Sequence, residues 1–139
     1  MLRSDVTLET LSKRQTGTLP EHFGFTPTGV SEGLLTAELR IQPWMLAPNR
    51  FLHAASVILL ADTAAGYGTM THLPLGAVGF TTIELKSNFL GTAREGVIRV
   101  EAVGEHLGRT TQVWASTVFN EEGKRIALFR CTQMILVQG

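Results

Sequence analysis

The chain has 139 residues, 44% of them hydrophobic, and its twelve Lys and Arg balance twelve Asp and Glu to give a net charge of zero. This length makes one folding unit, and the apolar content excludes a disordered chain and indicates surface for a subunit interface. Zero net charge excludes the global electrostatic attraction that drives binding to nucleic acid or to anionic membranes. The single cysteine, Cys131, excludes an intrachain disulfide and favours a reducing compartment. With no secretory signal and no apolar stretch of membrane-spanning length, we expect a cytoplasmic protein without a membrane partner.

The first part of the chain predicts a short helix and then a hairpin. Apolar residues spaced among polar ones, without Gly or Pro, predict an amphipathic helix over residues 5–15. We assign residues 1–22 to an N-terminal helical segment. Residues 23–30 and 34–41 then predict two strands joined by a tight turn. Two prolines predict a loop over residues 42–50.

The rest of the chain predicts one buried helix followed by strands. Residues 52–70 are rich in helix formers and apolar on nearly every face, which is typical of a buried helix. We expect loops at residues 71–79 and 104–108, and strands at residues 80–90, 96–103, 110–119 and 125–137. Consecutive hairpins place neighbouring strands antiparallel, and an all-apolar helix must be covered. The predicted fold class is therefore α+β, with an antiparallel sheet covering one long helix.

One acidic residue stands out chemically. Asp62 is the only Asp, Glu, Lys or Arg between Arg50 and Glu84, and it lies in the middle of the apolar helix. A carboxylate is rarely buried without partners, and burial raises its pKa, which suits a general base or a nucleophile. The same residue is also compatible with a structural role, in which it hydrogen-bonds Thr63 or backbone N–H groups, or reaches solvent. The sequence leaves both interpretations open.

His53 is not a partner for Asp62 within one chain. Nine residues of helix turn about 900° and rise about 13.5 Å, so the two side chains lie on opposite faces. His53 instead precedes the helix, where the first backbone N–H groups lack intrahelical acceptors and can polarise a carbonyl oxygen. These N–H groups and Asp62 could meet only between two antiparallel helices of a dimer.

Four motifs together resemble a known family. Residues 52–66 (Leu-His-Ala-Ala-Ser-Val-Ile-Leu-Leu-Ala-Asp-Thr-Ala-Ala-Gly) resemble the helix motif of hot-dog-fold acyl-CoA thioesterases of the phenylacetate-degradation and 4-hydroxybenzoyl-CoA thioesterase type. Residues 82–90, 93–96 and 106–109 resemble later signatures of the same family, in the expected order. The resemblance implies a hot-dog domain over residues 23–139 that works as a dimer or a dimer of dimers. It also implies hydrolysis of an aromatic or short to medium acyl-CoA to the free acid and coenzyme A.

The resemblance further implies roles for single residues. Asp62 would attack the thioester carbonyl or activate water, while the backbone N–H of Ala54 of the other subunit polarises the thioester oxygen. Asn49, upstream of His53, matches the polar residue that helps to orient substrate or water in the family. We assign substrate binding to six further residues, among which the arginine suits the phosphates of coenzyme A: Phe51, Thr63, Gly66, Thr82, Asn88 and Arg109.

The sequence departs from the family pattern at two places. Alanines stand at positions 54 and 55 in place of the usual glycines, and their methyl groups narrow the approach to the N–H groups. Gly66 stands where relatives often carry a Ser or Thr that positions water.

We expect no metal site and no cofactor other than the coenzyme A of the substrate, because the four histidines lack metal-ligand spacing. Two alternatives stay open. The first is a non-catalytic protein that binds acyl-CoA or an acyl carrier, and the second is an enoyl-thioester hydratase.

Overall fold

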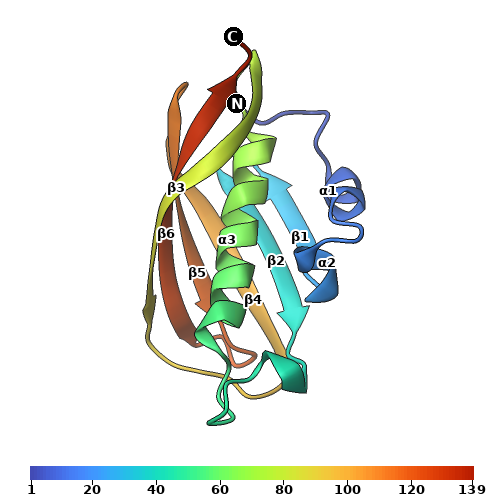
Figure 1. Cartoon of the computed structure of the whole chain (residues 1–139), viewed down its shortest axis with the longest axis vertical. Helices are drawn as coiled ribbons and strands as arrows, with labels where there is room; N and C mark the ends of the chain where they lie inside the picture. Colours follow the sequence, from blue (N-terminus) through green and yellow to red (C-terminus); the bar gives the residue numbers. More distant parts are fainter.

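The computed structural model describes residues 1–139 as a six-stranded antiparallel sheet with one long helix, α3 (Ala54–Thr71), across one face (Figure 1). The strands lie in the order β1-β2-β4-β5-β6-β3. Their bounds are β1 (Thr26–Ser31), β2 (Leu34–Arg40), β3 (Ala77–Phe89), β4 (Val97–Leu107), β5 (Thr111–Phe119) and β6 (Arg125–Val137). The α+β class and the hot-dog arrangement of sheet and central helix are thereby confirmed.

The core lies between α3 and the middle of the sheet. Most residues of α3 are buried, as expected for a helix without a polar face, and it packs mainly against β2, β4 and β5. The buried Ser116 hydroxyl on β5 donates to the Ala61 carbonyl at 2.9 Å, which joins the middle of the helix to the sheet. The sheet thus covers one side of α3 and leaves part of the opposite side half-buried.

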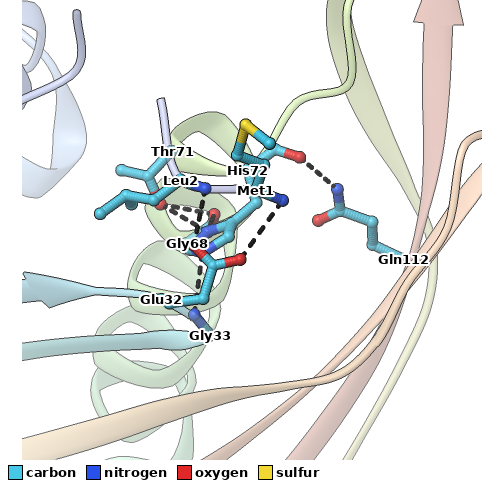
Figure 2. A network of polar contacts seen from close by, with 8 residues as sticks. All are labelled: Met1, Leu2, Glu32, Gly33, Gly68, Thr71, His72 and Gln112. Atoms are coloured by element: carbon cyan, nitrogen blue, oxygen red, sulfur yellow. Dashed lines mark hydrogen bonds and ion pairs between the residues drawn. The ribbon is translucent and has the colours of Figure 1, made fainter. Parts of the chain in front are cut away.

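A polar network fixes the C-terminal end of α3 (Figure 2). The ring of the buried His72 accepts a hydrogen bond from the Gly33 N–H at Nε2, at 2.8 Å, and its Nδ1 lies 2.8 Å from the Gly68 carbonyl. The Gln112 side chain on β5 donates to the His72 carbonyl at 2.9 Å. The end of α3 is therefore joined both to the β1–β2 turn and to the middle of the sheet.

The N-terminal region differs in detail from the prediction. The first helix, α1 (Leu8–Arg14), is shorter than expected because Thr7 and Thr10 form reciprocal capping bonds that start it at residue 8. A second short helix, α2 (Leu19–His22), was not expected. The following strand begins only at Thr26, since the chain turns at Gly24 with a φ of 75°. Leu11 of α1 is fully buried in the same core as α3.

Other strand boundaries also differ. A 3-10 turn (Pro43–Met45) lies in the predicted proline-rich loop. The loop expected at residues 104–108 is largely strand, because β4 continues to Leu107 through a bulge after Gly104. β3 begins at Ala77 rather than at residue 80, since Ala77 pairs with Val137 at the end of β6. No helix in the structure combines the length and the hydropathy needed to cross a membrane.

Candidate active site

Asp62 is half-buried on α3, and its carboxylate lacks compensation. The Oδ1 atom is inaccessible to solvent and has no hydrogen-bond partner. Desolvation by burial raises the pKa of Asp62 above its ordinary value. Both observations favour a reactive carboxylate over one held by local hydrogen bonds, since buried polar atoms of purely structural groups are normally satisfied.

Cys131 on β6 lies within electrostatic reach of Asp62. Burial and then the negative charge of Asp62 raise the pKa of the Cys131 thiol to about 12. The thiol is therefore protonated at neutral pH and is a poor nucleophile. Its place among buried apolar residues indicates a packing role.

The start of α3 presents backbone N–H groups. His53 is the N-cap, and its Nδ1 accepts a hydrogen bond from the Ala55 N–H at 2.9 Å. The His53 carbonyl accepts from the N–H groups of Ser56 and Val57. The N–H of the exposed Ala54 donates no hydrogen bond within the chain. Ala54 is therefore the one backbone donor at this end that remains open to a ligand.

The loop before α3 is held in place by local contacts. The Asn49 Oδ1 accepts a hydrogen bond from the Phe51 N–H at 3.1 Å, so the side-chain oxygen of Asn49 stabilises the local turn. Arg50, inside this turn, has a φ of 70°. The guanidinium of Arg94 lies 4.2 Å from the centroid of the Phe51 ring. Phe51 is 38% exposed and remains accessible near the start of α3.

Asp62 and Ala54 lie apart in a single chain. Eight residues of α-helix separate them by about 12 Å along the axis and by about 80° around it. One chain therefore supplies a carboxylate at one point of α3 and an open N–H at another, but not both at a single carbonyl group.

Three of the predicted substrate residues lie on the same side of the sheet as Asp62. Gly66 is one helical turn after Asp62, and a Cβ at this position would lie 3.3 Å from the ring of Phe80 on β3. Thr82 on β3 donates its hydroxyl hydrogen to the Oε1 atom of Gln133 at 2.6 Å. Thr63 follows Asp62 on α3 and is half-buried.

Gln133 was missed by the sequence reasoning. Its side chain is fully buried, and its Nε2 atom has no hydrogen-bond partner. A polar residue at an inward-facing position of the last strand, between Cys131 and Ile135, is the signal that could have found it.

The other two predicted substrate residues lie away from Asp62. Asn88 pairs with Leu128 and lines a hollow of about 500 Å³ together with Lys86 and Arg130, on the face of the sheet opposite to α3. Arg109 is exposed at the β4–β5 turn, where it lines a hollow of about 720 Å³ beyond the end of α3. No three His, Cys, Asp or Glu side chains converge closely enough to share a metal ion.

Comparison with known proteins identifies the family. Residues 49–127 match the model of the Thioesterase superfamily. The chain is 31% identical over 134 residues to the proofreading thioesterase EntH of Cronobacter sakazakii. The alignment covers 94% of this chain and 95% of the relative. It is 27% identical over 114 residues to a 1,4-dihydroxy-2-naphthoyl-CoA hydrolase of Listeria monocytogenes, covering 82% and 92% of the two chains.

A solved structure agrees in fold. The crystal structure of a mutant thioesterase from Pseudomonas aeruginosa superposes with a TM-score of 0.92 over 99% of both chains, at 24% sequence identity. The matched segment of the family model contains the loop before α3, the whole of α3 and its acidic residue. The chain therefore belongs to the Thioesterase superfamily and is a thioester hydrolase of the hot-dog fold.

Proposed function

We propose that the protein hydrolyses an acyl-CoA, of aromatic or short to medium acyl group, to the free acid and coenzyme A. Asp62 acts as the nucleophile or as the general base that activates water. The observation that carries this role is the buried, unpaired Oδ1 of Asp62, the one acidic side chain of the apolar helix. A desolvated carboxylate is a stronger base and nucleophile than a hydrated one, because its charged form is poorly stabilised.

The electrophilic half of the site comes from a second copy of the chain. The open N–H of Ala54 at the start of α3 would donate to the thioester oxygen and stabilise the charge that develops on it. In this arrangement two α3 helices lie antiparallel, with Ala54 of one subunit level with Asp62 of the other. Residue 58, halfway between these two positions, then lies opposite its own copy on the two-fold axis. Ile58 is half-buried and shares an open stripe of the helix with Asp62, so it fits a two-fold contact.

Strand β3 supports the same assembly. It is an edge strand of 13 residues, all of them half-buried or exposed, and it carries Ile83, Leu85 and Phe89 with 41–54% of their surface accessible. A long apolar edge strand is a template for pairing with another chain. Pairing of two β3 strands would produce a homodimer, and a dimer of dimers could then follow.

The remaining proposals concern the thiol carrier, the location of the protein and the residues that support the site. We propose coenzyme A as the thiol carrier, with Arg109 at its phosphates and no other cofactor, and a cytoplasmic location. Asn49 and His53 hold the loop and the helix start in place through the bonds described above, so that they support the donor at Ala54.

The test is the release of free thiol from a panel of acyl-CoAs by the wild-type protein and by Asp62→Asn. We expect wild type to hydrolyse at least one class and the variant to lose about 100-fold or more in kcat, in the range typical of a lost general base or nucleophile. The high pKa of Cys131 keeps its reaction with the thiol reagent slow. Full activity of Asp62→Asn would disprove the role of Asp62.

A further inference from the structure

Two buried polar atoms of the chain have no hydrogen-bond partner, and they are complementary. One is the Oδ1 atom of Asp62, which is an acceptor, and the other is the Nε2 atom of Gln133, which is a donor. Every other buried side-chain nitrogen or oxygen atom has a partner. Because buried polar atoms are normally satisfied, an unpaired donor and an unpaired acceptor in one protein require an explanation.

The neighbouring strand fixes the amide of Gln133. Thr82 on β3 is the cross-strand partner of Gln133, and its hydroxyl donates to the Gln133 Oε1 atom at 2.6 Å. This bond occupies the oxygen of the amide, whereas both N–H groups of Nε2 stay free to donate. The Gln133 side chain is fully buried and shares its face of β6 with the buried Cys131 and Ile135, so bulk water does not reach these N–H groups.

The contacts of α3 place Gln133 level with the helix turn that runs from Asp62 to Gly66. Cys131, two residues before Gln133 on the same face of β6, lies within electrostatic reach of Asp62. Phe80 on β3 is paired one step further along β6 than Gln133, and its ring would lie 3.3 Å from a Cβ at Gly66. Gln133 therefore lies between the two places of the sheet that Asp62 and Gly66 approach.

Gly66 leaves the carboxylate of Asp62 uncovered on this side. The two residues lie one turn apart on nearly the same helix face, and a side chain at position 66 would point back toward position 62. Glycine supplies no such side chain. A group of the size of a water molecule can therefore approach the Oδ1 atom from the side of the sheet.

No charged side chain competes for the carboxylate within the chain. Desolvation is the sole cause that raises the pKa of Asp62, and the thiol of Cys131, which faces it, is protonated. The charged residues of β3 and β6 near Gln133 line the hollow on the opposite face of the sheet: Glu84, Lys86 and Arg130. The charged residues of β2 and of β4 before its bulge alternate to that same face, and β5 has none.

We propose that Gln133 is a positioning residue for the hydrolytic water, in that its Nε2 atom donates to a water molecule that donates in turn to the Oδ1 atom of Asp62. The inference rests on the proposed function, because it takes the thioester carbonyl to lie at Asp62. Buried waters typically join polar groups that are otherwise unsatisfied, and one water bridges a donor and an acceptor that are too far apart to bond directly. Both groups belong to one chain, so each subunit holds its own water.

The bridged water has one lone pair left for the reaction. Asp62 takes a proton from the water while the water oxygen attacks the thioester carbon. The new C–O bond forms, the C–S bond breaks, and the proton on Asp62 passes to the departing thiolate of coenzyme A. The products are the free acid and the free thiol, and Asp62 returns to its ionised form.

The first experiment titrates Asp62 directly. The chain has only two aspartates, Asp5 and Asp62, so protein labelled with ¹³C at the aspartate carboxyl gives two NMR signals, which Asp62→Asn assigns. We expect Gln133→Met, close in volume but without the donor, to raise the pKa of Asp62 further, because the bridged water stabilises the ionised form. The signal of Asp5, which is exposed and ion-paired with Arg3, should not move.

Gln112→Met is the matched control. Gln112 is the cross-strand partner of Gln133 on β5 and is equally buried, but both ends of its amide are bonded, to the His72 carbonyl and to Trp114. This variant should melt at a lower temperature and leave the pKa of Asp62 where wild type has it. Thr82→Val guards against a fold defect, since Thr82 is exposed, and should shift the pKa of Asp62 in the same direction as Gln133→Met.

The second experiment separates positioning from a structural role. Gln133→Met should lower kcat about 10- to 100-fold and leave the affinity for an S-alkyl-CoA thioether, which cannot be hydrolysed, unchanged. In the Asp62→Asn background the same substitution should cause no further loss, because the two residues act on one water.

Three results would overturn the inference: an unchanged pKa of Asp62 in both Gln133→Met and Thr82→Val, an equal shift in Gln112→Met, or losses of kcat that multiply in the double variant. Absence of thiol release by the wild-type protein would instead reject the proposed hydrolysis. The NMR titration needs no turnover and would still decide whether Gln133 acts on Asp62.

Discussion

The desolvated carboxylate of Asp62 costs stability, and we propose that it does so in return for reactivity. Its Oδ1 is shielded from water without gaining a hydrogen bond, so the charged form is less favourable in the folded chain than in the unfolded one. The raised pKa of Asp62 expresses this difference. Such unsatisfied groups tend to occur where chemistry needs them.

The pH dependence of activity follows from the direction of this shift. The carboxylate must be ionised to act, so kcat/KM should rise with pH and level off above the raised pKa of Asp62. We expect the midpoint to lie above the ordinary range of aspartate. A pH–rate profile of the wild-type protein measures it, and a midpoint at or below the ordinary value would contradict the desolvation argument.

The same group makes a separable contribution to stability. Only the ionised form of Asp62 carries the cost of desolvation. Because the pKa is higher in the folded state, the stability of the protein with respect to this group is fully present below the unfolded pKa. It is lost as pH rises through the folded pKa. Asp62→Asn, which is neutral at all pH values, should therefore melt at a higher temperature than wild type at neutral pH. Thermal unfolding of both proteins should show the difference shrinking under acidic conditions.

At the scale of elements, two glycines of α3 face different neighbours. A Cβ at Gly68 would lie 2.6–3.0 Å from three ring atoms of Trp114 on β5. Trp114 is fully buried, and its Nε1 donates to Gln112 at 2.9 Å, so the ring cannot move aside. Gly68 thus permits the close approach of helix and sheet, whereas Gly66 lies under the half-buried Phe80.

This difference predicts opposite effects of the same substitution. Gly68→Ala should reduce the free energy of unfolding, because overpacking costs about 1–3 kcal/mol and here exceeds the gain of about 1 kcal/mol in helix propensity. Gly66→Ala is the matched control, and it should be neutral or stabilising, since the Phe80 ring can shift by the few tenths of an ångström required. Denaturant unfolding of both variants measures the two effects. Equal stability of the two variants would show that Trp114 is not a fixed wall.

At the scale of the whole molecule, the two groups that we propose to act on one thioester lie at different points of a single chain. The carboxylate of Asp62 and the open N–H of Ala54 are about 12 Å apart along α3, so our proposal requires two subunits. The exposed β3 edge and the half-buried Ile58 provide the surfaces for such an assembly. Within one chain, a cluster of 24 buried hydrophobic residues already forms the core between α3 and the sheet.

Subunit complementation tests this arrangement. Ala54→Pro removes the N–H at the first helical position, where proline is well tolerated. We expect Ala54→Pro and Asp62→Asn homo-oligomers to be nearly inactive. Mixed oligomers should regain part of the wild-type rate, because one of the two sites in each mixed pair is intact. After random mixing of two equal populations about half of the pairs are mixed, so the rate should reach about a quarter of the wild-type rate.

Two outcomes would decide against the shared site. Failure of co-refolded mixtures to regain thiol release would place both groups of each site in one chain. Full activity of a protein that light scattering shows to be monomeric would do the same. A wild-type rate in the Ala54→Pro homo-oligomer would show that the Ala54 N–H takes no part in the reaction.

Several features followed from the sequence alone. The nearly continuous apolar character of residues 52–70 predicted a buried helix, and the alternation along residues 96–103 and 110–119 predicted strands, because both patterns depend only on local periodicity. Asp62 was predicted as a candidate catalytic residue because one charge in an apolar segment is visible without coordinates. The short α2 and the bulged end of β4 were missed, since capping and bulge geometry are weak signals in a single chain.

Other features depended on which segments the fold brings together. The order of strands places Thr82 beside Gln133, 51 residues away, and Phe80 over Gly66, and no local pattern specifies such pairs. It also separates Asn88 from Asp62, because side chains alternate between the two faces of β3. The sequence by itself determined the helix, the strands and the lone carboxylate that we propose as reactive, since these reflect local periodicity and charge. Only the tertiary structure decided what surrounds that carboxylate, because long-range pairing fixes each side chain to one face and one neighbour.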